Sequence, residues 1–454
     1  MAKILETVNG FVWGAPALLL ILGVGLYLTV RLGFAQFTLL PRAVKALFSA
    51  KSKGADGVSA YQALCTALAA TVGTGNLVGV AGAICLGGPG AIFWMWICGF
   101  LGMATKYAEA VLAVQYRVKD GDGYLGGPMF VMVKGLGKGF YPMAAAYCLC
   151  GMLAAFGVGT GTQINAVITG LHGVQARFGL TSTKTGDMLI GIAMGIGLCT
   201  LLLGGASAVG KVAERLIPFA ACGYLALCVG VLLVRYERIG EAFWMILQGA
   251  AAPRAVTGGM LGSAFTALRI GCSRGVFTNE AGMGTAAMAH GSAKVSHPAE
   301  QGLMGILEVF LDTIVICTMT ALVILVSGVP IPYGLDVGAE LTAASFSRIY
   351  GPNAVIWLTA AMLLFAVATV LGWGFYGARC AEFLFGKRAW KWFAVAQAAT
   401  AAISATLDTA TVWQLSETLN GLMAIPNLIT LAILTPVVCG LTKAFRKSEK
   451  GVLP

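Results

Sequence analysis

The chain has 454 residues, of which 58% are hydrophobic and only 11% are charged. Soluble domains contain about 25% charged residues, so this composition excludes an ordinary soluble domain and predicts a membrane protein with several spans. The net charge of +11 would also fit a nucleic-acid-binding protein. In a membrane protein, however, Lys and Arg gather in cytoplasmic loops, which accounts for the positive charge without a nucleic-acid partner.

Apolar runs long enough to cross a bilayer as helices recur from one end of the chain to the other. Two shorter segments, 240–250 and 337–349, are expected to be interfacial helices between spans. The predicted fold class is therefore an all-α polytopic membrane protein. Its eleven expected transmembrane helices are 11–30, 61–84, 91–114, 141–170, 188–204, 212–234, 260–290, 302–327, 353–377, 390–407 and 420–442.

The charges in the loops predict how these helices are oriented. If the loop after the first span is cytoplasmic, twenty Lys and Arg residues lie on that side and seven lie on the other. Cytoplasmic loops carry an excess of Lys and Arg. The sequence therefore predicts an amino terminus outside the cell and a carboxyl terminus in the cytoplasm.

The second expected span contains the sequence "VGTGN" at residues 72–76. Glycine favours unwinding there, and unwinding frees N–H and C=O groups that cost several kcal/mol each if they face lipid. Free N–H groups at a half-helix start suit a carboxylate, and free C=O groups at a half-helix end suit a cation. A close-packing face of small residues is the alternative. Where the helix unwinds, the freed backbone groups must face a ligand, water or protein. We expect a substrate carboxylate to bind at Thr74, Gly75 and Asn76, and a cation to bind at the carbonyls of Ala69 and Val72.

The seventh expected span, with "SRGVFTNEAGMG", is the other span that glycine interrupts strongly. Each interrupted span is the first of five consecutive spans. Because five is an odd number, each span of the second set crosses the membrane in the direction opposite to its equivalent in the first set. This order predicts an extra N-terminal helix and loop (1–60), a first five-helix repeat (61–235), an extracellular connection with an interfacial helix (236–259), a second repeat (260–443) and a cytoplasmic tail (444–454).

The seventh span also contributes candidate ligands. Thr278 and Asn279 are expected to hydrogen-bond the substrate directly. Glu280 is an ionisable residue at membrane depth, which indicates a functional site. A structural salt bridge from Glu280 to Arg269 or Arg274 is the alternative.

Three further spans offer polar candidates. Gln163 either bonds the substrate amine or joins neighbouring helices. Asp312 is a cation ligand, a proton-sensitive group or a charge paired near the cytoplasmic face. Thr369 and Trp373 lie four residues apart and hence on one helical face. The Thr369 hydroxyl is a hard oxygen ligand for a small cation, and the Trp373 ring would limit the size of the substrate side chain. Ordinary packing is the alternative for both.

Four sequence motifs resemble those of the alanine or glycine:cation symporter family, over residues 60–385. They are "TVGTGNLVGVAGAICLGGPGAIFWMW", "GGPMFVMVKGLG", "RGVFTNEAGMGTAAMAH" and "TVLGWGFYGARCAEFLFG". The family usually has "SNEAG" where this chain has "TNEAG", so Thr278 adds a methyl group that either tightens the cavity or packs.

The resemblance implies a leucine-transporter-like 5+5 inverted repeat with one extra N-terminal helix. It implies Na⁺-coupled symport of small neutral amino acids, chiefly alanine and glycine, across a bacterial inner membrane, with no enzymatic activity and no cofactor besides Na⁺. It also implies a role for particular positions. Substrate would contact Thr74, Gly75, Asn76, Gln163, Trp373 and the break around 272–278, and sodium would contact Thr369 with carbonyls of the second span.

Other functions remain alternatives at this stage. Proton coupling would use Asp312 or Glu280 as the proton carrier. A polytopic membrane enzyme would need a cluster of catalytic side chains at the interface, and no such cluster is visible in the sequence. A channel has no need of two broken helices. The expected partners are an amino acid, Na⁺ and the lipid bilayer.

Overall fold

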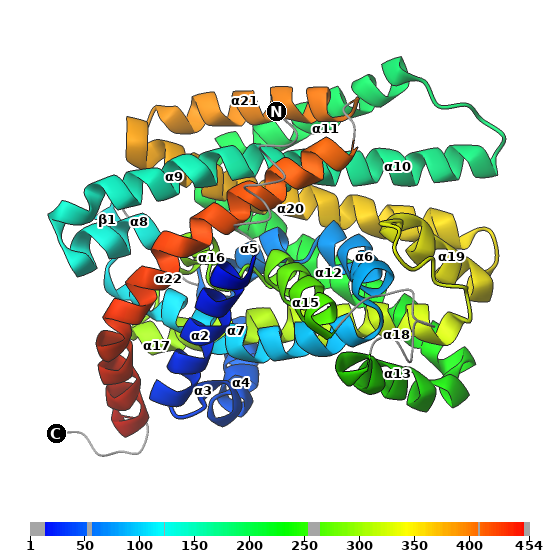
Figure 1. Cartoon of the computed structure of the whole chain (residues 1–454). Helices are drawn as coiled ribbons and strands as arrows, with labels where there is room; N and C mark the ends of the chain where they lie inside the picture. The colour runs from blue at the N-terminus through cyan, green and yellow to red at the C-terminus, as the bar shows by residue number, and fades with distance from the viewer. Residues whose placement is uncertain (1–13, 52–56, 122, 253–263, 407–408, 449–454) are drawn as a thin grey trace.

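The computed structural model describes residues 14–51, 57–121, 123–252, 264–406 and 409–448. These residues are almost entirely helical, as the sequence predicts (Figure 1). The strands are β1 (Val118–Asp120) and β2 (Gly123–Leu125), which pair antiparallel with Val118 opposite Leu125. The hairpin lies at the same end of the molecule as the last turns of α22 (Thr409–Ser448).

Most predicted spans correspond to one helix or to consecutive helices. Their bounds are α2 (Ala15–Arg31), α5 (Ala60–Thr71), α6 (Val78–Gly87), α7 (Gly90–Gln115), α9 (Tyr141–Phe156), α10 (Thr162–Arg177), α11 (Lys184–Leu203), α12 (Gly205–Val234), α15 (Ala264–Asn279), α16 (Ala286–His290), α17 (Pro298–Val309), α18 (Thr318–Ser327), α20 (Ala354–Phe385), α21 (Ala389–Ser404) and α22 (Thr409–Ser448). Shorter helices outside the spans are α3 (Ala35–Thr38), α4 (Leu40–Lys51) and α8 (Pro128–Val131).

Length and apolarity support fewer spans than the eleven expected. Within the described residues, seven helical segments are long and apolar enough to cross a membrane, or eight if the bent pair α5 and α6 counts as one span. The helix α2 is apolar but has only 17 residues, and α15 and α21 have 16 each. The structure therefore confirms a polytopic helical protein, and the count of eleven stays a prediction.

The two segments expected to be interfacial are helices. They are α13 (Ile239–Ala251) and α19 (Gly338–Tyr350), and both lie at the end of the molecule opposite β1 and α8 (Figure 1). Part of the connection after α13, residues 253–263, lies outside the described residues.

The first predicted break is present between α5 and α6. A capping box starts α5, because the Ser59 side chain accepts from the Gln62 N–H and Gln62 accepts from the Ser59 N–H. The helix ends where Val72 becomes extended, and a short 3₁₀ turn, η1 (Thr74–Asn76), leads into α6. The two helices are bent by 59° at this point.

The second predicted break follows α15. The chain leaves the helix after Asn279 and becomes helical again at Ala286. Within this interval Glu280 has a φ of 55°, Gly282 a φ of 92° and Gly284 a φ of 77°. Glycine adopts such angles readily, so Gly282 and Gly284 fit the non-helical segment, whereas Glu280 adopts an angle that is uncommon for a residue with a side chain.

Several long helices contain a π-helical segment that the sequence analysis does not predict. The segments are η2 (Met132–Leu136), η4 (Gly157–Gly161) between α9 and α10, and η6 (Phe310–Cys317) between α17 and α18. Such segments occur often at functional sites. The candidate residue Gln163 follows η4 closely in the chain, and the candidate residue Asp312 lies within η6.

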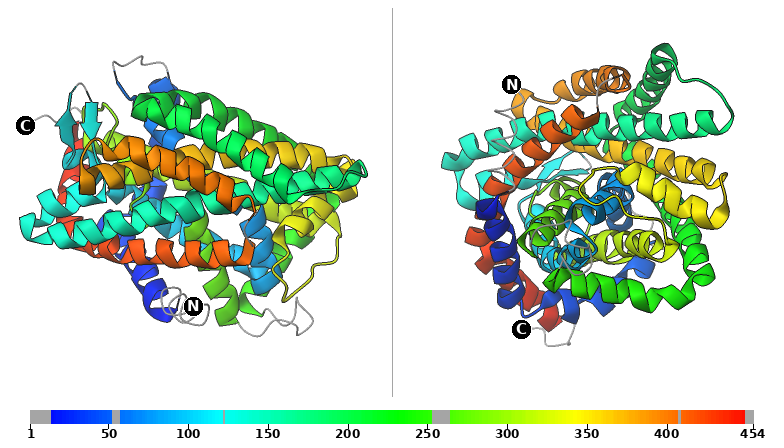
Figure 2. Two further views of the ribbon diagram at one scale, coloured as in Figure 1. Left: turned by 90° about the horizontal axis from the view of Figure 1, so that it is seen from above. Right: turned by 45° about the vertical axis from the view of Figure 1, so that its right-hand side comes forward.

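Glycines let the broken helices pack closely. A Cβ atom built on Gly271 of α15 would lie 2.2 Å from the carbonyl oxygen of Ala91 in α7, which only a glycine avoids. Every residue of α5 from Ala63 to Thr71 is buried. The residues of η1 and all residues from 275 to 293 are buried, so both breaks lie in the interior of the helical bundle (Figure 2).

Candidate functional site

The first break is joined to the fourth predicted span through Thr74. Its hydroxyl donates to Oε1 of Gln163 at 3.0 Å, and its backbone N–H approaches the same oxygen at 3.4 Å. Gln163 follows the π-helical segment η4, and both side chains are buried. The structure thus places these two predicted residues together, although they are far apart in sequence.

Asn76 joins the break to the eighth predicted span. Its side-chain Nδ2 donates to Oδ1 of Asp312 at 2.7 Å, and its Oδ1 accepts from the N–H of Gly73 at 2.8 Å. The Thr313 hydroxyl donates to the other Asp312 oxygen at 2.8 Å. Asn279 in turn donates to Thr313 at 3.0 Å. One hydrogen-bonded chain therefore links both breaks through η6.

The carboxylate of Asp312 is fully buried at 0% exposure. Its hydrogen-bond donors are uncharged, and among the described residues no Lys, Arg or His lies within ion-pair distance of it. A buried carboxylate without a cation is costly. This carboxyl group therefore suits either a bound cation or a proton.

Backbone carbonyls at the end of α5 face no donor. Among the described residues, the carbonyl oxygens of Ala69 and Val72 accept no hydrogen bond, because the helix ends before their usual partners. The hydroxyl of Thr369 is likewise buried without a partner. It lies against Gly73, where an added Cβ would be 2.5 Å from the Thr369 oxygen. Oxygen ligands for a small cation thus gather beside the first break.

Trp373 lies one helical turn beyond Thr369 in α20. Its side chain is completely buried and packs so tightly on η4 that a Cβ at Gly159 would lie 2.3 Å from Trp373 Cβ. Its ring forms an edge-on contact with Tyr376 at 5.9 Å. The residue forms part of the packed interior next to the break.

Thr278 faces the first break from the second one. A Cβ at Gly75 would lie 3.2 Å from the Thr278 methyl carbon, and the Thr278 hydroxyl donates to the carbonyl of Gly275 at 2.9 Å. The methyl group that distinguishes this residue from serine therefore points at the glycine of "VGTGN".

Sequence reasoning missed a buried ionic cluster near the second break. Lys106 Nζ lies 3.0 Å from Glu308 Oε1, and His290 Nε2 lies 2.9 Å from Glu308 Oε2. Gln301 contacts the other His290 nitrogen at 2.7 Å. All four side chains are fully buried. Two ionisable residues within apolar runs, Lys106 in 91–114 and Glu308 in 302–327, were the signals in the sequence that could have indicated the cluster.

The second break is held by Glu109, which sequence analysis also missed. One carboxylate oxygen accepts from the N–H groups of Gly282 at 3.0 Å and Gly284 at 3.1 Å, and from Asn427 Nδ2 at 2.7 Å. Asn427 also donates to the Gly282 carbonyl at 2.9 Å. Helices α7 and α22 therefore clamp the non-helical segment between them.

Glu280 lies within the same segment. Its carboxylate accepts from the hydroxyl of Thr285, and it is fully buried with Lys106 as a nearby charge. Arg274, one of the two arginines expected as alternatives, instead donates to Asp336 at 3.3 Å.

Comparison with known proteins adds a family assignment to this geometry. The family model described as the sodium:alanine symporter family matches residues 1–452. The chain is 43% identical to the sodium/alanine symporter AgcS of Methanococcus maripaludis, over 99% of this chain and 98% of that protein. It is 35% identical to the Bacillus subtilis protein named "Probable sodium/glutamine symporter GlnT", over 99% of this chain and 93% of that protein.

A solved structure resembles the fold as a whole. The crystal structure of MhsT in complex with L-phenylalanine matches with a TM-score of 0.57 at 14% identity. The match covers 86% of this chain and 99% of that chain. At this identity the match shows the fold alone.

Proposed function

Because the chain belongs to the sodium:alanine symporter family, we propose that it couples the entry of Na⁺ to the uptake of small neutral amino acids, chiefly alanine and glycine. The proposed architecture has eleven spans with a 5+5 inverted repeat after one extra N-terminal helix, and the domain limits follow the predicted ones. The amino terminus lies outside the inner membrane and the carboxyl terminus lies in the cytoplasm. The protein catalyses no chemical reaction.

The proposed substrate site lies at the two breaks. Thr74, Gly75 and Asn76 receive the carboxylate. The N–H of Gly75 has no acceptor among the described residues, and it lies in the 3₁₀ turn that leads into the start of α6. Gln163 accepts from the Thr74 hydroxyl at 3.0 Å, which supports a role for Gln163 as a contact of the amino acid. Thr278, Asn279 and Trp373 complete the remaining walls.

The proposed sodium ligands are Ala69, Val72, Thr369 and Asp312. The observation that carries this assignment is the set of buried oxygens without a donor at the end of α5, together with the Thr369 hydroxyl. Asp312 adds a negative charge that reaches the substrate site through Asn76. Carbonyl, hydroxyl and carboxylate oxygens are the ligands that hard cations prefer.

The size of the site favours small side chains. The Thr278 methyl and the buried Trp373 ring both lie against the glycine-rich segments that surround the site. A side chain much larger than methyl would displace one of them. This argument supports alanine and glycine over the glutamine named for one relative.

Coupling follows when Na⁺ and substrate stabilise the same closed state, because each then raises the affinity for the other. A membrane potential contributes about 2.3 kcal/mol per charge per 100 mV, and about 1.4 kcal/mol corresponds to a tenfold concentration ratio. One Na⁺ per amino acid therefore suffices for accumulation.

The test is uptake of labelled alanine and glycine into liposomes that contain the pure protein. An inward Na⁺ gradient is compared with K⁺ and with a proton gradient at matched membrane potential. We expect accumulation with Na⁺ alone, and its loss in Asn76→Ala and Thr369→Ala. Thr369→Ser retains the hydroxyl and is expected to retain Na⁺ dependence. Passive flux without accumulation would indicate a channel and contradict the proposal.

Proton coupling is the second candidate, and the lack of a cationic partner for Asp312 favours it as well. A buried carboxyl group can be neutralised by a proton in place of Na⁺. In this case the liposomes accumulate alanine with a proton gradient alone. Loss of that accumulation in Asp312→Asn, but not in Glu280→Gln, would assign the proton to Asp312.

A further inference from the structure

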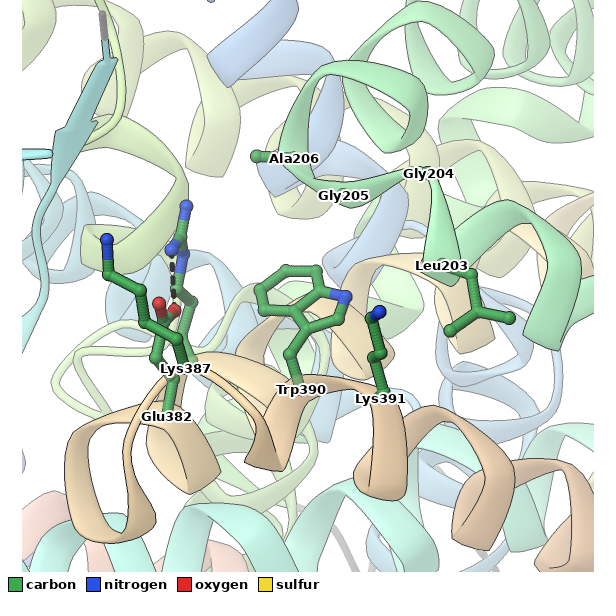
Figure 3. Close-up of a pocket in the computed structure, with 9 residues that line it drawn as sticks. Leu203, Gly204, Gly205, Ala206, Glu382, Lys387, Trp390 and Lys391 are labelled. Atoms are coloured by element: carbon green, nitrogen blue, oxygen red, sulfur yellow. Dashed lines mark hydrogen bonds and ion pairs between the residues drawn. The ribbon is translucent and has the colours of Figure 1, made fainter. Parts of the chain in front are cut away.

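A groove lies at one end of the bundle, where α11, α12, α20 and α21 begin or end (Figure 3). The connection at residues 203–206 forms one wall, and Arg379, Glu382, Lys387, Trp390 and Lys391 form the rest. Its volume is about 290 Å³. None of these residues belongs to the breaks that carry the proposed transport site.

Arg379 is fixed in place at the groove. Its Nη1 lies 2.7 Å from Glu382 Oε2, and its guanidinium carbon lies 5.2 Å from the centre of the Phe375 ring and 5.1 Å from that of Trp390. The side chain is only 10% exposed, yet its Nε–H has no acceptor in the part of the chain that the structure describes. A buried donor without an acceptor costs free energy unless a ligand supplies one.

The start of α12 contributes further donors. This helix has 30 residues, its N-cap is Gly204, and no side chain caps it. Within the described part of the chain, the N–H groups of Gly205 and Ala206 have no acceptor. The first turn of a long helix carries a partial positive charge that favours anions. In Figure 3, Trp390 and Lys391 face this connection from α21.

The charges of the groove are complementary to an anion. Its lining contains three cationic side chains, those of Arg379, Lys387 and Lys391, and one carboxylate, that of Glu382, which pairs with Arg379. The Lys387 side chain is 74% exposed and forms an ion pair with Asp120. Lys391 is exposed, and none of the ion pairs between described residues includes it. The groove therefore keeps an excess of positive charge.

The neighbouring surface is apolar. Leu203, Phe385 and Trp392 are 48%, 68% and 76% exposed. Exposed Trp and Phe beside basic residues are typical of the level at which lipid headgroups lie. A ligand with a phosphate and attached acyl chains would use both the charges and this surface, whereas free phosphate would use only the charges.

We propose that this groove binds the phosphate of an anionic phospholipid headgroup. The phosphate accepts hydrogen bonds from the N–H groups at the start of α12 and from Arg379. The positive charge of Lys391 attracts the negative charge of the phosphate. Basic pockets between membrane helices bind anionic headgroups by the same chemistry. The bound lipid thereby joins the ends of α11, α12, α20 and α21.

The test uses the full-length protein purified in detergent. Its melting temperature is measured with added phosphatidylglycerol, with phosphatidylcholine and with inorganic phosphate. We expect phosphatidylglycerol alone to raise the melting temperature of the wild type. Lys391→Glu should lose most of that rise. The matched control is Lys138→Glu, which makes the same charge change at another exposed position and should keep the full rise.

Lys391→Gln is a milder variant, and a partial loss of the rise is expected there. An equal rise in the wild type and in both Lys391 variants would overturn the proposal, as would equal effects of phosphatidylglycerol and phosphatidylcholine. A rise of the same size with inorganic phosphate would assign the groove to free phosphate and overturn the lipid assignment. Lipid retained per protein molecule, counted by native mass spectrometry, should fall in Lys391→Glu and not in the control.

Discussion

The side-chain nitrogen of Asn76 lies 2.7 Å from a carboxylate oxygen of Asp312, which connects the first broken helix to the π-helical segment η6. Thr313 and Asn279 extend this connection to the second break. A change at any member of the chain is therefore felt at both breaks. If the ion and the substrate bind at the proposed residues, this relationship lets each influence the other without a direct contact between them.

Replacing Asp312 by Asn tests the role of its charge. The variant has nearly the same shape, so the fold should persist, but a cation loses a charged ligand. Hydrogen bonds and contacts that involve a charged group contribute about 1.5–3 kcal/mol, which corresponds to about 10- to 150-fold. We expect the Na⁺ concentration for half-maximal alanine uptake to rise by about that factor. The measurement is Na⁺-dependent uptake in liposomes.

The matched control for this variant is Asp187→Asn. Asp187 is paired with His172 at 2.8 Å near the surface, away from the breaks. Its variant should keep the wild-type Na⁺ dependence. An unchanged Na⁺ dependence in Asp312→Asn would remove Asp312 from the sodium site.

Gly75 and Thr278 should act as a pair. A methyl group at Gly75 would lie 3.2 Å from the Thr278 methyl carbon, so Gly75→Ala crowds the site and should reduce kcat/KM for alanine uptake. Thr278→Ser removes the opposing methyl and should restore part of the activity in the double variant. Gly79→Ala is the control, because a Cβ there meets no atom within 4 Å. Strict additivity of the two changes would mean that the side chains do not meet.

Glu109 should stabilise the segment after α15. Glu109→Ala removes the acceptor of two backbone N–H groups, and each buried donor left unsatisfied costs about 1–3 kcal/mol. We expect a clearly lower melting temperature in detergent. Glu109→Gln retains an acceptor oxygen and should lose less. Glu340→Ala, at an exposed glutamate, serves as the control. Equal losses in the Gln and Ala variants would show that the charge, not the hydrogen bonding, holds the segment.

His297 gives the protein a pH-dependent helix cap outside the spans. Its Nδ1 accepts from the N–H of Ala299 at the start of α17, which requires an unprotonated nitrogen. Burial lowers the pKa of His297 below its usual value of 6.5, although Glu300 acts in the opposite direction. The unfolded chain then binds more protons than the folded one. The contribution to stability is therefore complete above pH 6.5 and is lost as the pH falls below it.

The variant for this prediction is His297→Asn, which caps a helix without titrating. Between pH 7.5 and pH 5.5 the melting temperature of the wild type should fall more than that of the variant. Parallel curves would show that the cap does not depend on the protonation of His297.

Local sequence predicted the breaks because their signals are local. Glycine and polar residues inside an apolar run, as at Gly73 and Gly282, are visible without knowledge of the fold. The partners of these residues are not visible, because Asn76 and Asp312 meet only when spans two and eight pack. The π-helical segments depend on the same packing, and no residue type marks them. The number of spans stayed uncertain because α15 and α21 are short, and length is the main criterion for a span.

The buried pair of Lys106 and Glu308 has a consequence for the synthesis of the protein. Helix α7 carries both Lys106 and Glu109, and it has the lowest hydropathy of the seven apolar segments. A lysine at the centre of an isolated helix opposes insertion by about 2.5–3.5 kcal/mol, and Lys106 lies between the centre and the carboxyl end of α7. Glu308 follows much later in the chain, so α7 must enter the bilayer before its partner exists. The helix should therefore insert poorly on its own, and its final position is reached only when α17 joins it.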